Sequence, residues 1–244
     1  MNHSANNPYQ TPAMGYNPVA AAAATDERVS FIRNTYLHLA GAVFALMMIE
    51  LVLFNLAGAL VPKLSSLMMG GRFNWMIVLG LFMGVNYIAE KWAMSDSSRG
   101  MQYAGLGLTV VAWSILLVPL LAVASTNYAG AIESAAAVTL IVFAGLSAVV
   151  MFTKADFSFL RYALYLGGLA AMAAIVVSFF VNTNILGPWF SWAMIVLASG
   201  YILYHTSNIL HHYRTDQHVA ASLALFSSVT MLFWYVLQLF MSRD

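Results

Sequence analysis

Long apolar stretches alternate with short polar breaks along most of the chain, and this alternation predicts its architecture. A helix crosses a hydrocarbon core of about 30 Å with about 20 apolar residues, whereas a membrane-barrel strand needs only about 9 to 11 alternating ones. Seven stretches reach the helical length, at residues 35–61, 74–92, 103–124, 129–152, 159–181, 189–210 and 219–240. The breaks between them are too short for a second domain. The pattern therefore predicts an all-α, polytopic membrane protein, a bundle of seven transmembrane helices.

The first residues of the chain follow a different pattern. Residues 1–25 are rich in Asn, Pro, Ala and Tyr and nearly uncharged, so they offer little apolar surface for folding. We expect residues 1–28 to form a flexible N-terminal tail and residues 29–244 to form the transmembrane domain. A basic segment followed by an apolar stretch is missing from the tail, so no cleaved signal peptide is expected.

Lys and Arg predict the orientation, because they accumulate in the cytoplasmic loops of membrane proteins. Seven of the ten basic residues lie on the side of the N-terminus, and Lys63, Arg72 and Arg243 lie on the other. We therefore expect a cytoplasmic N-terminus and, after seven crossings, a C-terminal Asp244 on the opposite side. The lipid bilayer is the first expected partner.

The amino-acid composition argues against several classes of protein. The chain is 61% hydrophobic and 8% charged, with a mean hydropathy of +0.79, while soluble domains carry about 25% charged residues. A net charge of +1 gives no basic surface for nucleic acid. The absence of cysteine excludes thiolate zinc sites, iron–sulfur clusters and cysteine nucleophiles.

Polar side chains inside the apolar stretches are the candidate functional residues, since an ionisable group in lipid costs about 2.5 to 3.5 kcal/mol. Glu50, about fifteen residues into the first predicted helix, and Asn86 are candidates for a buried polar site or an ion path. Glu50 can equally be a structural carboxylate or lie near the far interface. Glu90 and His205 have similar predicted depths near the ends of their helices, which suggests a pH-sensitive latch. Alternatively, Glu90 reaches the headgroups and His205 bonds a neighbouring carbonyl.

Searches for catalytic and cofactor motifs give negative answers. The histidines of the loop 211–218 lack a complete set of metal ligands, and we interpret this loop as a solvated, partly basic turn. No zinc-protease motif, nucleophile elbow or phosphate-binding loop is present. We therefore expect no enzyme activity, no catalytic residues, no metal and no cofactor.

Three segments together resemble one known family. Arg33-Asn34-Thr35-Tyr36 begins the first helix, Phe157-Ser158-Phe159-Leu160 begins the fifth, and Tyr204-His205-Thr206-Ser207-Asn208 lies near the end of the sixth. Their order and spacing, with a terminal Ser242-Arg243-Asp244, are similar to the Bax inhibitor-1 (transmembrane Bax inhibitor motif) family, most of all to its bacterial YccA branch. The resemblance covers about Arg28 to the end and implies that six helices surround the seventh.

The resemblance implies two alternative functions. YccA-like proteins modulate FtsH, a membrane AAA protease, which would make this chain an inner-membrane protein of membrane protein quality control. Other relatives are pH-sensitive calcium leaks, in which two carboxylates share a proton at positions that match His205 and Ser228. Because neither residue is a carboxylate, a calcium site at these positions is disfavoured and the latch would involve Glu90 with His205 instead. Modulation of an FtsH-like protease is our main expectation, and a leak of calcium, protons or another cation is the alternative.

Overall fold

The computed structural model describes residues 18–95, 98–181 and 186–242, and within them the chain is helical apart from its loops. The predicted tail up to residue 17 and the terminal Arg243-Asp244 lie outside the described residues. The helices are α1 (Thr25–Asn55), α2 (Leu60–Met69), α3 (Arg72–Ala93), α4 (Arg99–Asn127), α5 (Ala131–Thr153), α6 (Leu160–Val181), α7 (Pro188–His211) and α8 (His218–Met241).

Seven of these helices, all except α2, are long and apolar enough to cross a membrane. They coincide with the seven apolar stretches of the sequence, most closely for α3, α5, α6, α7 and α8. The predicted fold class, an all-α bundle of seven transmembrane helices, is confirmed.

The first predicted span differs from the structure at both of its ends. Helix α1 begins at Thr25, ten residues before the predicted start, and ends at Asn55 rather than at residue 61. Asp26 and Glu27 in its first turn stabilise the positive end of the helix dipole, so the helix extends beyond its apolar part. A helix of 31 residues is about 46 Å long, more than the hydrocarbon core requires.

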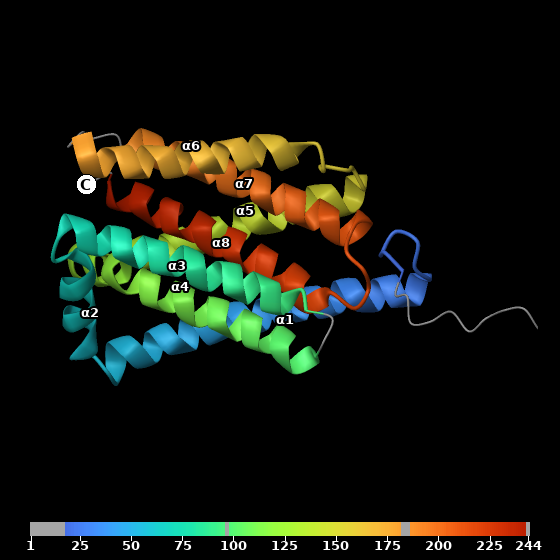
Figure 1. Ribbon diagram of the computed structural model, residues 1–244, viewed down its shortest axis with the longest axis horizontal. Helices are drawn as coiled ribbons and strands as arrows, with labels where there is room; N and C mark the ends of the chain where they lie inside the picture. Colours follow the sequence, from blue (N-terminus) through green and yellow to red (C-terminus); the bar gives the residue numbers. More distant parts are fainter. Residues whose placement is uncertain (1–17, 96–97, 182–185, 243–244) are drawn as a thin grey trace, which may run out of the picture.

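Helix α2 covers residues 60–69. It therefore occupies most of the break between the first two predicted spans, which we expected to be a loop. Its ten residues span about 15 Å, too short to cross the bilayer. Val61 and Met68 are seven residues apart and therefore lie on the same face of α2, and both are buried where α2 packs on α3 and α4. Helix α2 therefore forms a cover at the end of the bundle where α1 ends (Figure 1).

Helix α8 is the centre of the bundle. Within its most apolar part, 72% of the residues are buried, against 6% in α6. Helices α1, α3, α4, α5 and α7 pack on α8, while α6 lies outside them along α7 (Figure 1). The implied arrangement, with the seventh spanning helix in the middle, is confirmed, but five helices rather than six form its surrounding wall.

Helices α3 and α4 approach each other unusually closely at Gly105. A Cβ atom at this position would lie 2.5 Å from the Ala89 carbonyl oxygen and 2.8 Å from the Ala93 nitrogen. Ala89 and Ala93 are themselves fully buried small residues, four apart on the facing side of α3. Small residues on both helices are typical of close helix packing in membranes, where the backbones come into contact.

One end of the bundle gathers the elements that concern function, and we call it the N-terminal end. The start of α1 lies there together with the end of α7 and the start of α8, as a hydrogen bond from Arg28 to the Leu210 carbonyl and the ring contact of His38 with His218 show. The loop between α5 and α6 joins them through Ser207.

Candidate functional site

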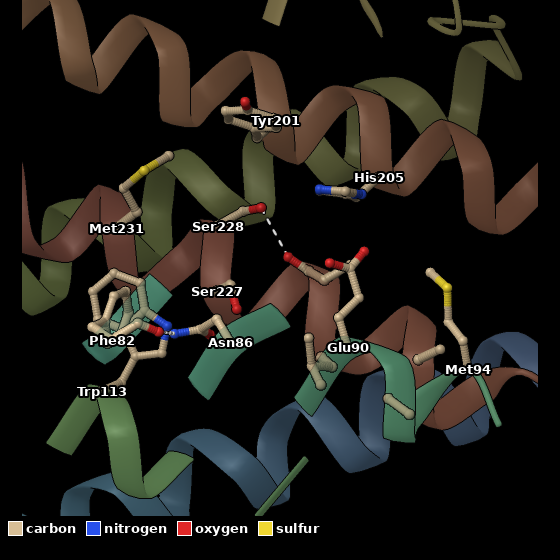
Figure 2. A pocket seen from close by; sticks show the side chains of 14 residues that line it. Phe82, Asn86, Glu90, Met94, Trp113, Tyr201, His205, Ser227, Ser228 and Met231 are labelled. Carbon is tan, nitrogen blue, oxygen red and sulfur yellow. Dashed lines mark hydrogen bonds between the residues drawn. The ribbon is translucent and has the colours of Figure 1, made fainter. Parts of the chain in front are cut away.

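A cavity of about 340 Å³ lies between α3, α7 and α8 near the N-terminal end. Asn86, Glu90, His205 and Ser228, four of the five residues singled out in the sequence, line it together. Phe82, Met94, Trp113, Tyr201, Ser227 and Met231 contribute further side chains (Figure 2). The cavity thus unites polar groups from three helices that are up to 142 positions apart in the sequence, from Asn86 to Ser228.

Glu90 and His205 lie on opposite walls of this cavity. In Figure 2 the Glu90 carboxylate points from α3 into the cavity, toward the His205 ring on α7. Within the part of the chain that the structure describes, neither a hydrogen bond nor an ion pair joins them. The predicted latch residues therefore face each other without closing, and their pairing stays a prediction.

Aromatic rings hold His205 in place. The Tyr201 ring stacks on the imidazole at 5.9 Å between centroids, and the Tyr204 ring meets it edge-on at 5.2 Å. Its Nδ1 atom is buried and has no hydrogen-bond partner among the described residues. A carbonyl partner for His205, the alternative suggested by the sequence, is therefore not found at Nδ1.

Ser228 and Asn86 use their hydrogen-bond donors within their own helices. The Ser228 hydroxyl donates to the Ala224 carbonyl at 2.9 Å, the dashed line in Figure 2. The Asn86 amide donates to the Phe82 carbonyl at 2.8 Å. Each side chain keeps an oxygen that can accept a hydrogen bond from a molecule in the cavity.

Glu50 does not line the cavity. Because α1 begins at Thr25, Glu50 lies 25 residues along the helix, about 37 Å from its start, and only five residues before its end. It follows Leu46 by four positions on the buried face of α1, and both of its carboxylate oxygens are buried without a hydrogen-bond partner among the described residues. The structure thus places Glu50 near the far end of the bundle and facing inward.

The α5–α6 loop is fastened to α7 by Ser207, which the sequence did not single out as a site residue. Its hydroxyl accepts a hydrogen bond from the Phe157 N–H at 2.8 Å and lies 3.3 Å from an Asp156 carboxylate oxygen. Asp156 also accepts from the Ser158 N–H at 2.9 Å and faces His212 at 3.5 Å. The Ser158 backbone hydrogen bond lowers the pKa of the Asp156 carboxyl, and His212 adds to this effect.

Two of the segments on which the family resemblance rests therefore meet in space. The Phe157 to Leu160 segment supplies the backbone donor, and the Tyr204 to Asn208 segment supplies the serine hydroxyl that accepts it. Their separation of about 50 residues concealed this contact in the sequence. Ser207 thereby joins the α5–α6 loop to the end of α7.

The segment before α1 is also fixed to the bundle. Val19 and Arg214 form an isolated antiparallel bridge, in which the Ala20 N–H donates to the Tyr213 carbonyl at 2.8 Å and the Thr215 N–H donates to the Pro18 carbonyl at 3.2 Å. Ala20 is fully buried. The last part of the predicted tail, from Pro18 onward, is thus hydrogen-bonded to the bundle.

Tyr213 connects this bridge to the cavity. Its side chain is half-buried near Glu90 and Tyr204, and desolvation, together with the nearby Glu90 carboxylate, raises the pKa of the phenol. The backbone of Tyr213 holds the N-terminal segment, while its ring lies beside a cavity residue.

Arg214 completes this turn by pairing with Asp216 through two hydrogen bonds of 3.1 Å. Groups of three or more metal-ligating side chains are missing from the described residues, including the loop of histidines that precedes α8. The turn that we interpreted as solvated and partly basic contains an internal ion pair, and residues 213–217 are half-buried.

Comparison with known proteins gives a consistent family relationship. Residues 28–244 match the family described as inhibitor of apoptosis-promoting Bax1. The chain is 29% identical to protein PA2604 of Pseudomonas aeruginosa over 231 residues, which cover 92% of this chain and 95% of the relative.

Two relatives with functional names match shorter parts of the chain. The modulator of FtsH protease YccA of Escherichia coli is 34% identical over 108 residues, 43% of this chain and 49% of the relative. Bax inhibitor 1 of Schizosaccharomyces pombe is 34% identical over 103 residues, 42% of this chain and 39% of the relative. With a family match over nearly its whole length and a seven-span bundle around α8, this multi-pass membrane protein belongs to the Bax inhibitor-1 family.

Proposed function

We propose that this protein modulates a membrane-bound protease of the FtsH type, and thereby takes part in the quality control of membrane proteins. A non-enzymatic role is consistent with the sequence, in which we find no catalytic motif. The relationship to a protein named as a modulator of FtsH supports the choice of partner.

The observation that carries the proposal is the fixed position of the segment before α1. Pro18 and Ala20 are hydrogen-bonded to the loop between α7 and α8, so the chain before them starts from a defined point at the N-terminal end. The 17 residues before Pro18 contain no Lys, Arg, Asp or Glu. Terminal segments of this kind are the parts of a protein that proteases reach most easily.

The distribution of charge supports a cytoplasmic location for this end, where the ATP for an AAA protease is available. Seven of the ten basic residues belong to this end: Arg28, Arg33, Lys91, Arg99, Lys154, Arg161 and Arg214. Basic residues in short loops remain on the cytoplasmic side during insertion into the membrane. We therefore assign the protein to the bacterial inner membrane with a cytoplasmic N-terminus.

A reconstituted assay tests the proposal. Purified FtsH from Escherichia coli and a tagged membrane substrate are placed in proteoliposomes, and the degradation rate is measured with increasing amounts of this protein. We expect the degradation rate of the substrate to fall as the amount of this protein rises. An unchanged rate at a large molar excess would refute the proposal.

Variants of the segment before α1 sharpen this test. Deletion of residues 1–17 should remove the effect on the protease. Ala20→Arg introduces a charge at a fully buried position and should detach the segment, whereas Ala21→Arg changes an exposed neighbour and serves as the matched control. If the two arginine variants modulate the protease equally, the bridge has no part in the function.

A pH-sensitive cation leak is the second candidate, and the cavity favours it. Asn86, Glu90, His205 and Ser228 could form part of a polar path, with Glu90 and His205 as its latch. Flux into liposomes at about pH 6 and pH 8, on either side of the ordinary histidine pKa, should differ and lose this difference in His205→Ala. Flux no greater than that of empty liposomes would exclude this candidate.

A further inference from the structure

The cavity between α3, α7 and α8 exists because α8 has small side chains on the side that faces it. Ala220, Ala224 and Ser228 recur every four residues and form its floor, with Ser227 beside them. Leu223 and Met231 lie at the edges of this strip. Since α3 and α7 pack on α8 rather than on each other, nothing larger from the described helices fills the gap. A volume of about 340 Å³ lies in the range of small-molecule sites.

The charge of the cavity is negative. Glu90 is the only acidic side chain that lines it, and neither Lys nor Arg is among the lining residues. Lys91, the neighbour of Glu90, turns away, with its ammonium 4.5 Å from the centre of the Tyr87 ring outside the cavity. An anionic ligand would therefore meet an unbalanced carboxylate, while a cation would be stabilised.

The remaining lining residues favour a soft organic cation over a metal ion. Phe82, Trp113 and Tyr201 present aromatic rings, which attract ammonium groups, and Met94 and Met231 add adaptable apolar contacts. Calcium takes six to eight oxygen ligands, typically with several carboxylates, and this cavity offers one carboxylate and a few neutral oxygens.

Two side chains on opposite sides of the cavity, Trp113 and His205, each have a buried nitrogen atom (Figure 2). Trp113 Nε1 and His205 Nδ1 are both buried without a hydrogen-bond partner among the described residues, and both side chains line the cavity. Buried polar atoms of this kind are costly when they stay unpaired. An ammonium group can donate a hydrogen bond to His205 Nδ1 where that nitrogen carries no proton, but it cannot accept one from the Trp113 N–H, which is only a donor.

We propose that this cavity binds a small organic monocation, an ammonium group carrying a short apolar chain, with Glu90 as its counter-ion. The ammonium lies at the Glu90 carboxylate, and the chain lies over α8 among Phe82, Trp113 and Tyr201. Binding at equilibrium requires neither transport nor a protease, so it is measured separately from both functions proposed above, although the cation leak would use the same cavity.

Intrinsic tryptophan fluorescence tests the proposal, because Trp113 lines the cavity. The purified full-length protein is titrated with n-butylammonium chloride at constant ionic strength, and Trp113→Phe identifies the responding ring. We expect saturable binding that weakens by at least about tenfold in Glu90→Gln, which keeps the shape and removes the charge. Glu133→Gln is the matched control, because Glu133 is exposed in the first turn of α5 at the opposite end.

Two ligand comparisons complete the test. n-Butanol, which has the same chain without the charge, should bind at least about tenfold more weakly than n-butylammonium. Calcium chloride should not displace the ammonium at equal concentration. If the parent and Glu90→Gln bind n-butylammonium equally well, the site is only an apolar pocket. The same conclusion follows if n-butanol and n-butylammonium bind with equal affinity. Displacement by calcium would identify a divalent-cation site instead. Each of these results would overturn the proposal.

Discussion

The close contact of α3 with α4 yields a quantitative prediction for two neighbouring glycines. Gly105→Ala places a methyl group 2.5 Å from the Ala89 oxygen and 2.8 Å from the Ala93 nitrogen, both main-chain atoms that cannot rotate away. Ordinary contact begins about 1 Å further out, so α3 has to move. Overpacking of this kind costs about 1 to 3 kcal/mol.

Gly107→Ala is the matched control on the same helix. A methyl group at Gly107 meets nothing within 4 Å. Both variants gain the same intrinsic helix propensity, about 1 kcal/mol at most, so this gain cancels when they are compared. The difference between them isolates the contact, and we expect Gly105→Ala to be the less stable by about 1 to 3 kcal/mol.

Thermal unfolding in detergent, followed by tryptophan fluorescence, measures this difference. For a chain of this size, about 1 kcal/mol corresponds to about 2 to 4 °C, so the Tm of Gly105→Ala should lie about 2 to 12 °C below that of Gly107→Ala. Equal Tm values for the two alanine variants would refute the packing argument. Since Ala93 and Glu90 belong to the part of α3 that must move, Gly105→Ala should also alter the affinity of the cavity for n-butylammonium.

Two further predictions concern the fastening of the α5–α6 loop. Ser207→Ala leaves the Phe157 N–H without its acceptor and should destabilise the protein by about 1 to 3 kcal/mol; Ser178→Ala, which removes only a bond within α6, should cost less when Tm values are compared. Asp156 has a native pKa below its ordinary value near 3.9, so its contribution to stability is present above about pH 4 and is lost as the pH falls through the native pKa. Asp156→Asn should therefore lower Tm at pH 6 and flatten the loss of Tm below pH 4; parallel Tm curves for Asp156→Asn and the parent would contradict this.

The spanning helices could be predicted because lipid imposes a simple rule on the sequence. Every backbone group must be bonded inside the helix, so apolar length alone marks a span. The rule does not apply outside the lipid, which explains the missed start of α1 at Thr25 and the missed helix α2. There, the first-turn acids Asp26 and Glu27 and the buried positions Val61 and Met68 decide the structure instead.

Part of the candidate site could be predicted from the sequence. Asn86, Glu90, His205 and Ser228 stood out because polar groups are costly in lipid, and the structure brings them to one cavity. The absence of an ion pair between Glu90 and His205 depends on how far α8 separates α3 from α7, a distance that no residue pattern encodes. The recurrence of Ala220, Ala224 and Ser228 was the available signal for the cavity itself.

The bridge between Val19 and Arg214 determines how a mechanical load would enter the molecule. A pull on the chain before Pro18 acts on α1 and, through the hydrogen bonds of 2.8 and 3.2 Å, also on the loop that leads into α8. Most of the other helices pack on α8. The pulling force therefore reaches the middle of the bundle before α1 has unwound. Extraction from the N-terminus should therefore proceed through one large yielding event rather than helix by helix.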